Sequence, residues 1–215
     1  YNNNVPLFSG SGAFGTLLNP KAYGAPRYTS VQTSTFTEDV VFRDIDIIPM
    51  TGNYDDTVME PVHFLPLVPV ALLNGVSGIA VGHATNILPH TLQDVVAAQI
   101  EALTAGEVTT VPAPNSVTST GPVVAKTDTL FEFYGIVKIV DTSTARVMEL
   151  PYGKTHQSFL QLLSELINKG TISNYVDNSS SSVDIEIKFP RGSLKGVAED
   201  QLISTLNLKE RHTEN

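Results

Sequence analysis

The feature that most constrains this fold is a long uncharged segment in the middle of the chain. Residues 61–93 contain no Asp, Glu, Lys or Arg. Prolines divide the segment into apolar pieces well short of the ~20 residues that a membrane-spanning helix needs. Gly75, Gly78 and Gly82 recur at short intervals, and glycine is favoured where the backbone needs positive φ or a close approach. The pattern predicts a buried, turn-rich core segment.

Two interpretations of this glycine segment are open. It is either a packed turn that binds nothing, or a place where backbone comes close to a large ligand. The spacing of Gly75, Gly78 and Gly82 matches neither the dinucleotide fingerprint nor a phosphate loop, and no Gly-Lys-Ser/Thr sequence follows it. The segment therefore gives no support to a nucleotide-binding site.

Charge is distributed unevenly along the 215 residues, whose net charge is −9. Residues 1–37 hold two bases and no acid, whereas residues 38–60 hold seven acids and one base. Lys and Arg usually dominate affinity for DNA because they neutralise phosphates, so the total charge predicts weak DNA binding by this chain alone. The field near the N-terminus can still be locally positive.

The remaining composition limits the class of protein. The length fits one large or two small domains, and the absence of cysteine excludes disulfides and thiolate metal sites. No leader peptide is visible, and the chain starts at Tyr1 rather than at a methionine. We expect an excised piece of a longer cytoplasmic protein that has no contact with a membrane.

Helical signals occur at three places. Thr91 is a predicted N-cap for a helix that extends to about residue 104, and Gly106 follows its end. Residues 155–169 place apolar side chains at helical spacing and predict the clearest helix. A last helix is predicted over residues 193–206.

Strand signals complete an α+β pattern. Residues 130–140 and 145–150 predict an antiparallel hairpin, and residues 183–189 alternate apolar with polar side chains as a half-buried strand does. Residues 105–122 are rich in Pro, Thr and Ser and predict an exposed loop.

The pair Arg27 and Tyr28 is a candidate chemical site. A phenol with a pKa near ~10 is a poor nucleophile unless a cation stabilises its phenolate character. Pro26 fixes the backbone before the pair. We expect an extended segment, in which adjacent side chains point in opposite directions, so that Arg27 holds a target phosphate rather than touching the phenol. By itself, an Arg-Tyr pair has an alternative interpretation as a surface or packing contact.

Several blocks occur in the order found in one enzyme family. They are Asn2, Asn3, Asn4, Pro6, Leu7, Phe8, Gly10, Gly12, Phe14 and Gly15; Ala25, Arg27, Tyr28 and Thr29; Glu60, Pro61, Leu65 and Pro66; Leu73, Asn74, Gly75, Gly78, Ile79, Ala80, Val81, Gly82, Ala84, Thr85, Asn86, Ile87, Pro89 and His90; and Glu149, Leu150, Pro151 and Tyr152. Over essentially its whole length the chain resembles the breakage-reunion subunit of type IIA DNA topoisomerases, the gyrase A and topoisomerase IV A subunits. Within the family it is most similar to the medium subunit of T-even-type phages.

The resemblance implies a two-part α+β fold. Residues 1–60 correspond to the C-terminal end of a winged-helix domain that carries the active-site tyrosine. Residues 61–215 correspond to a tower domain with a mostly antiparallel sheet and flanking helices. It also places a winged-helix portion before Tyr1 and a coiled coil beyond Asn215.

The resemblance implies roles for individual residues. Tyr28 is the nucleophile that forms a transient 5′-phosphotyrosyl link during double-strand passage, and Arg27 supports the phosphoryl group. Ile79, between Gly78 and Ala80, is a wedge that enters the base stack. Together with Lys21, these three residues are the candidate DNA contacts. The alternative for Ile79 is an ordinary core residue.

Partners and cofactors also follow from the resemblance. The expected partners are double-stranded DNA, a subunit with ATPase and TOPRIM domains, and a second copy of the full-length subunit. Mg²⁺ and ATP are expected on the partner subunit, with no metal ligand in this chain. This piece alone is expected to be inactive.

One residue departs from the family pattern, and two histidines have no chemical role assigned by it. Gln32 stands where the family commonly has arginine, and together with the acidic total it supports an alternative: a non-catalytic DNA-bending or scaffold module that keeps the fold. We expect His83 and His90 to make structural polar contacts, since no third ligand is spaced with them as in a metal site.

Overall fold

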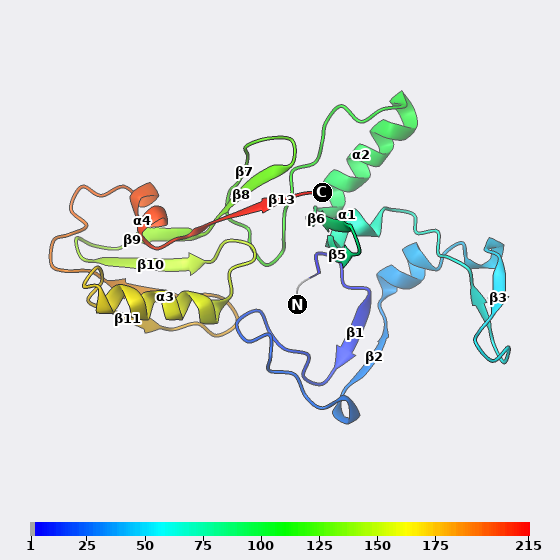
Figure 1. Cartoon of the computed structure of the whole chain (residues 1–215), viewed down its shortest axis with the longest axis horizontal. Coiled ribbons are helices and arrows are strands. Elements are labelled where there is room, and N and C mark those ends of the chain that lie inside the picture. The colour runs from blue at the N-terminus through cyan, green and yellow to red at the C-terminus, as the bar shows by residue number, and fades with distance from the viewer. Residues whose placement is uncertain (1–2) are drawn as a thin grey trace.

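The computed structural model describes residues 3–215, and its elements mix short helices with many strands (Figure 1). In chain order they are β1 (Phe8–Ser11), the 3-10 turn η1 (Pro26–Tyr28), β2 (Ser30–Thr33), the π-helical turn η2 (Thr37–Val41), the 3-10 turn η3 (Ile45–Ile47), β3 (Met50–Gly52), β4 (Met59–Pro61), α1 (Val70–Asn74), β5 (Val76–Ala80), β6 (His83–Ile87), α2 (Leu92–Ala105), β7 (Val123–Ala125), β8 (Leu130–Tyr134), β9 (Ile136–Ile139), β10 (Thr144–Glu149), α3 (His156–Asn168), β11 (Asn174–Asp177), β12 (Ile185–Lys188), α4 (Glu199–Thr205) and β13 (Lys209–Thr213). Every strand pair among the described residues is antiparallel. The predicted α+β class is therefore confirmed.

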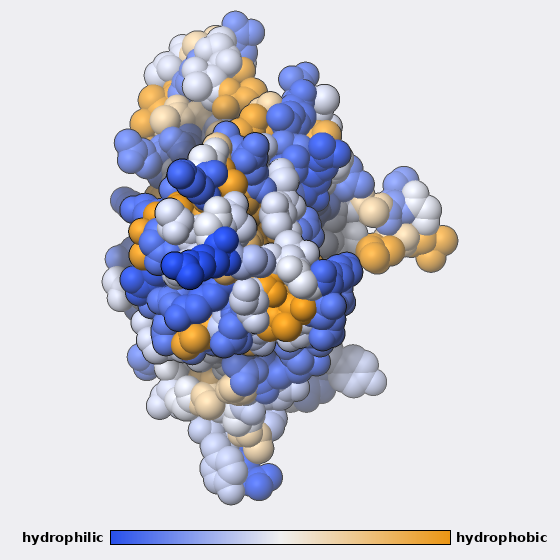
Figure 2. All heavy atoms as spheres, turned by 90° about the vertical axis from the view of Figure 1, so that its left-hand side faces the viewer, coloured by the Kyte–Doolittle hydropathy of each residue, from blue (hydrophilic) through white to orange (hydrophobic). Residues whose placement is uncertain are grey.

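Most of the hydrophobic core lies in one lobe, residues 136–208, which we call the C-terminal lobe. Its sheet has the strand order β11-β12-β10-β9, and α3 lies alongside it (Figure 1). The buried residues of the main core all fall between Val137 and Leu208. Figure 2 views the molecule from the side of this lobe, and hydrophilic residues cover most of that face.

Helix α3 forms where its sequence predicts. The Thr155 side chain accepts a hydrogen bond from the Ser158 N–H at 3.2 Å and so caps the first turn. Phe159 and Leu163, one helical turn apart, are fully buried against the sheet. Burying each such side chain contributes about 1.5–3 kcal/mol. Gly170 then ends the helix with φ of 72°.

The strand predicted over residues 130–140 is divided at Gly135. A side chain there would place its Cβ 2.6 Å from the Glu149 carbonyl oxygen, and the Gly135 N–H donates to the Leu208 carbonyl at 2.9 Å. Strand β8 therefore joins β7 and β13 in one sheet, while β9 pairs with β10 in another. The predicted hairpin between residues 136–140 and 145–150 is confirmed by the β9–β10 pairing.

Two other predictions on this side of the molecule need correction. The loop over residues 105–122 is not exposed throughout, because Ser116 and Ser119 are buried and form a small bridge. The last helix begins at Glu199, and most of residues 190–198 form turns instead. The strand predicted over residues 183–189 is present as β12, with Ile185 and Ile187 fully buried.

The prediction that residues 61–93 form a buried core is wrong for most of the segment. Leu73, Leu88 and His90 are buried, but β5 is exposed along its whole length. The strands of the N-terminal half form three two-stranded ribbons, β1–β2, β3–β4 and β5–β6 (Figure 1). A ribbon without a covering layer exposes its apolar side chains whatever their hydropathy. In the described part of the chain, no helix combines the length and the apolar character needed to cross a bilayer.

A buried carboxylate connects the strands of the β13-β8-β7 sheet. Glu132 of β8 has a side chain that is only 2% exposed. Its oxygens lie 2.8 Å from the Arg211 Nε, 3.2 Å from the Lys126 Nζ and 3.5 Å from the Lys209 Nζ, and accept a hydrogen bond from the Tyr134 hydroxyl at 2.7 Å. The hydrogen bonds from Tyr134 and Arg211 lower the pKa of Glu132 to about 2.

We predict that Glu132→Gln lowers the melting temperature at pH 7, because three cations then face one another without a carboxylate. The folded-state pKa is below the ordinary value of 4.5, so this contribution is present above about pH 4.5 and is lost as pH falls toward 2. Thermal melts followed by circular dichroism between pH 7 and pH 3 should show the difference from wild type shrinking with acidity. Glu186→Gln, at an exposed pair with Lys188, is the control. A pH-independent difference would contradict the prediction.

Candidate functional site

Tyr28 lies at the end of a 3-10 turn that leads into β2. The Tyr28 N–H donates to the Ala25 carbonyl at 2.9 Å, and Pro26 occupies the first position of the turn. Proline suits this position because its fixed φ matches the turn and its missing N–H is not needed there. The Tyr28 side chain is 70% exposed, so the phenol is accessible to a large ligand.

The guanidinium of Arg27 lies over the Tyr28 ring, with its Cζ 4.6 Å from the ring centroid. The expected extended segment, with Arg27 directed away from the phenol, is therefore wrong. In a 3-10 turn successive side chains are separated by about a third of a turn rather than placed on opposite faces. A stacked guanidinium is a cation–π contact that orients both groups. Among residues 3–215, Arg27 forms no ion pair with a carboxylate.

Gly12 allows the chain after β1 to pass close to the backbone of the turn that carries Tyr28. It follows β1 with φ of 106°, and a Cβ at this position would lie 2.7 Å from the Tyr28 carbonyl oxygen. Only glycine fits both the backbone angle and the space. The sequence shows three glycines in this loop without showing which one faces Tyr28.

The β5–β6 hairpin presents an apolar tip. Ile79 is 93% exposed and Val81 is fully exposed, so the interpretation of Ile79 as an ordinary core residue is wrong for this chain. Gly82, with φ of 77°, forms the turn, and an added Cβ at either Gly78 or Gly82 would meet nothing within 4 Å. The tip is therefore narrow and free of charge.

Asparagine side chains join the hairpin to residues 3–33, which carry Tyr28 and which we call the arm. The Asn74 amide accepts from the Val5 N–H at 2.8 Å and donates to the Val5 carbonyl at 2.8 Å. Asn4 donates to the His90 carbonyl at 2.9 Å and accepts from the Val117 N–H at 2.8 Å. Four segments that are distant in sequence are thus joined through two side-chain amides.

The other edge of the hairpin is held by the C-terminal end of the described chain. Asn86 and Asn215 exchange two backbone hydrogen bonds of 2.9 and 3.1 Å. The Asn86 amide also donates to the Thr213 carbonyl at 2.7 Å, and Glu214 accepts from the Leu88 N–H at 2.8 Å. The base of the hairpin is therefore fixed from both sides, while its tip stays free.

The other predicted residues fall in different surroundings. His90 is buried, with Nδ1 3.1 Å from the Leu72 carbonyl oxygen, which agrees with a structural polar contact. His83 is exposed on β6. Lys21 is exposed in the loop before Tyr28, and Gln32 is exposed in β2 opposite Ser9.

The structure thus brings Arg27 and Tyr28 into contact and places Ile79 on a separate ribbon (Figure 1). Within residues 3–215, no three His, Asp or Glu side chains gather in a way that could hold a metal ion. A magnesium site built from this chain's own carboxylates does not fit the residues present. The site has an accessible phenol with a neighbouring cation, and a separate apolar tip.

A family model for the A-type subunits of DNA gyrase and topoisomerase IV matches residues 1–215. The chain belongs to this family. It is similar to the DNA topoisomerase medium subunit of Enterobacteria phage T4, with 36% identity over 173 residues, covering 80% of this chain and 38% of that protein. It is also similar to the DNA gyrase A protein of Haloquadratum walsbyi, with 30% identity, covering 92% of this chain and 25% of that protein.

A solved structure supports the same fold for this member of the gyrase/topoisomerase IV A family. The DNA-binding, cleavage and re-ligation domain of Plasmodium falciparum topoisomerase II matches with a TM-score of 0.86 and 26% identity, covering 98% of this chain and 29% of that chain. The chain thus spans about a quarter to two fifths of the lengths of these relatives. The family predicted from the ordered sequence blocks is confirmed.

We predict that Asn74→Ala loosens the connection between arm and hairpin. It leaves the Val5 N–H and carbonyl without their partner, at a cost of about 1–3 kcal/mol. Amide hydrogen exchange at Val5 should accelerate by roughly 10- to 100-fold. Asn168→Ala, at the exposed end of α3, is the control and should leave exchange at Val5 unchanged. Unchanged exchange in the Asn74 variant would contradict the role of this amide pair.

Proposed function

We propose that this chain is the DNA-cleaving and religating part of a type II topoisomerase, with Tyr28 as its nucleophile. The proposal assigns residues 1–60 to the end of a winged-helix domain and residues 61–215 to a tower domain. The observation that carries it is an accessible phenol beneath a guanidinium that has no carboxylate partner among residues 3–215, in a member of the gyrase/topoisomerase IV A family.

The proposed step exchanges one phosphate ester for another. The Tyr28 phenol oxygen attacks a DNA phosphorus in line, a new P–O bond to tyrosine forms, and the bond to the 3′ oxygen breaks. The phenol proton leaves with the base that accepts it, and the released 3′ oxygen gains a proton. Because one ester replaces another, attack by the 3′ hydroxyl restores the strand without an energy source.

Arg27 fits two demands of this step. Charge develops on the phosphoryl oxygens during transfer, and a guanidinium can donate to two of them at once. Its position over the ring also keeps the phenol oriented before DNA arrives. The proposed role is therefore both to position Tyr28 and to stabilise the transferring group.

Ile79 is proposed to bend the cleaved segment. An apolar side chain that enters a base step costs a few kcal/mol of unstacking, which is offset when bent DNA contacts more protein. The exposed Ile79, between Gly78 and Ala80, meets the steric requirement for such a wedge. Lys21 is proposed to contact a phosphate, from the same loop region as Arg27.

The rest of the reaction is assigned to partners. Mg²⁺ and ATP are proposed to bind a partner subunit with ATPase and TOPRIM domains, and the full-length subunit is proposed to form a homodimer on double-stranded DNA in the cytoplasm. In the relatives, the matched region is only part of a longer protein, so this piece alone is proposed to be inactive.

We predict that Tyr28→Phe in the complete enzyme abolishes the covalent adduct, lowering DNA cleavage by at least about a thousandfold, because no other group replaces the nucleophile. Adducts trapped by denaturation and separated on gels measure this. Tyr23→Phe is the matched control, since Tyr23 is 69% exposed in the same arm. Equal adduct from wild type and the Tyr28 variant would favour the alternative, a non-catalytic DNA-bending or scaffold module.

We predict that Ile79→Ala reduces DNA bending and weakens binding by roughly tenfold, because the wedge is lost while the hairpin stays intact. Energy transfer between dyes at the ends of a short duplex reports the bend. Leu103→Ala is the control, since Leu103 is 79% exposed on α2 and outside the proposed contact. Bending by the Ile79 variant equal to wild type would contradict the wedge.

A further inference from the structure

A pocket of about 630 Å³ lies where the arm that carries Tyr28 meets the C-terminal lobe. Leu17 and Leu18 of the arm form one wall, and Leu150 and Tyr152, which follow β10, lie among the residues of the other. Pockets of about 300–1,000 Å³ hold drug-sized molecules. The pocket is separate from Tyr28, Arg27 and Ile79.

The arm wall is held in place by its own turn and by the lobe. The Thr16 N–H donates to the Asn19 carbonyl at 3.0 Å, and the Asn19 N–H donates to the Thr16 hydroxyl at 3.0 Å. This turn projects Leu18 against the main core of the C-terminal lobe. A molecule in the pocket would therefore touch the arm and the lobe together.

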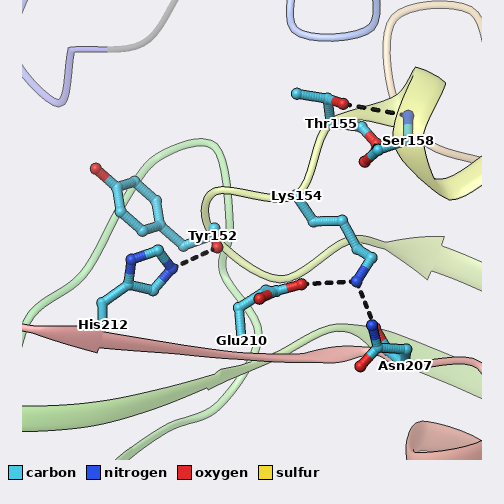
Figure 3. Close-up of polar contacts among 7 residues, drawn as sticks. All are labelled: Tyr152, Lys154, Thr155, Ser158, Asn207, Glu210 and His212. Atoms are coloured by element: carbon cyan, nitrogen blue, oxygen red, sulfur yellow. Dashed lines mark hydrogen bonds and ion pairs between the residues drawn. The ribbon is translucent and has the colours of Figure 1, made fainter.

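The ammonium of Lys154, which lines the pocket, is already paired. The Lys154 ammonium lies 2.7 Å from a Glu210 carboxylate oxygen and donates to the Asn207 carbonyl at 2.7 Å (Figure 3). The Glu149 carboxylate accepts from the Thr120 hydroxyl at 2.7 Å. An anionic ligand would lose hydration without gaining a free ammonium group. The lining thus favours a neutral molecule over an anion.

Tyr152 offers an unused donor beside an aromatic wall. Its ring packs against Phe133 and His212, each with centroids 5.1 Å apart, and its carbonyl lies 2.9 Å from the His212 Nε2. Burial raises the pKa of the Tyr152 phenol above its ordinary value, so the hydroxyl keeps its proton. In Figure 3 this hydroxyl points away from His212 and from the Lys154 pair, and no residue among 3–215 forms a hydrogen bond with it.

We propose that this pocket binds a neutral aromatic molecule that carries one hydrogen-bond acceptor, which stacks against Tyr152, contacts Leu18 and accepts a hydrogen bond from the Tyr152 hydroxyl. The binding itself does not depend on the function proposed above. Its consequence does: because the arm forms one wall, an occupied pocket changes DNA cleavage by Tyr28, and that part rests on the proposed function.

The test uses 2-acetylnaphthalene as the probe, naphthalene as the same ring without an acceptor, and 2-naphthoate as the charged analogue. Leucine methyl NMR of the 215-residue chain follows Leu17, Leu18 and Leu150, with Leu103 on α2 as the internal control. The ketone should cause saturable shifts at the first three residues and none at Leu103, with a Kd of about 1 mM or tighter. Absence of saturable shifts, or naphthoate binding as tightly as the ketone, overturns the proposal.

A conservative variant tests the hydrogen bond. Tyr152→Phe should weaken binding of the ketone by roughly 3- to 10-fold and leave naphthalene within about twofold, because one neutral hydrogen bond is lost and the ring is kept. Tyr54→Phe, at a fully exposed phenol on the loop between β3 and β4, should change neither. Equal weakening of both ligands by Tyr152→Phe overturns the assigned contact.

The effect on cleavage is measured separately in the complete enzyme by titration with the ketone. A change in covalent adduct of at least twofold at saturation, whose midpoint concentration rises roughly 3- to 10-fold in Tyr152→Phe, supports coupling between pocket and arm. Binding without any change in adduct overturns the coupling. If Tyr28→Phe still forms adduct, the function proposed above fails while the NMR result stands, so the two failures are distinguishable.

Discussion

Two side-chain amides hold together the half of this molecule that carries its candidate chemistry. Asn74 pairs with both backbone groups of Val5, and Asn4 links the segments around His90 and Val117. The N-terminal half has few buried apolar residues, since the main core lies within residues 137–208. Hydrogen bonds between distant segments therefore fix the positions of these segments, as packing does in the C-terminal lobe. Each buried or half-buried amide must stay paired to do so.

This constraint explains how short ribbons can present exposed groups in defined positions. An isolated two-stranded hairpin is marginally stable in water. The β5–β6 hairpin is held at its base on one side through Asn74 and on the other through Asn86 and Glu214, so its apolar tip can remain uncovered. The Tyr28 turn is likewise supported by a close backbone approach at Gly12. Both candidate contact points combine a fixed base with a free end.

The C-terminal lobe is held together mainly by apolar packing. Its helix α3 and its sheet bury a continuous core, and in the adjoining sheet the Glu132 carboxylate lies among three cations. The lobe meets the arm through Leu18, beside a pocket whose Lys154 ammonium is already paired with Glu210. The lobe, held by a packed core, and the arm, held by hydrogen bonds, therefore share one boundary, and the pocket proposed to bind a small molecule lies there.

Local sequence determined the elements whose signals lie within a few residues of one another. The caps at Thr91 and Thr155, the apolar face of α3 and the β9–β10 hairpin are as predicted, and the ordered motifs identified the family. Only the tertiary structure decided which side chains are buried and which are exposed. It exposed Ile79 within a segment predicted to be buried, buried Ser116 in a segment predicted to be exposed, and stacked Arg27 on Tyr28. The Asn74 contact joins segments 69 residues apart. Burial likewise depends on which distant segments cover a residue, and neither hydropathy nor local spacing contains that information.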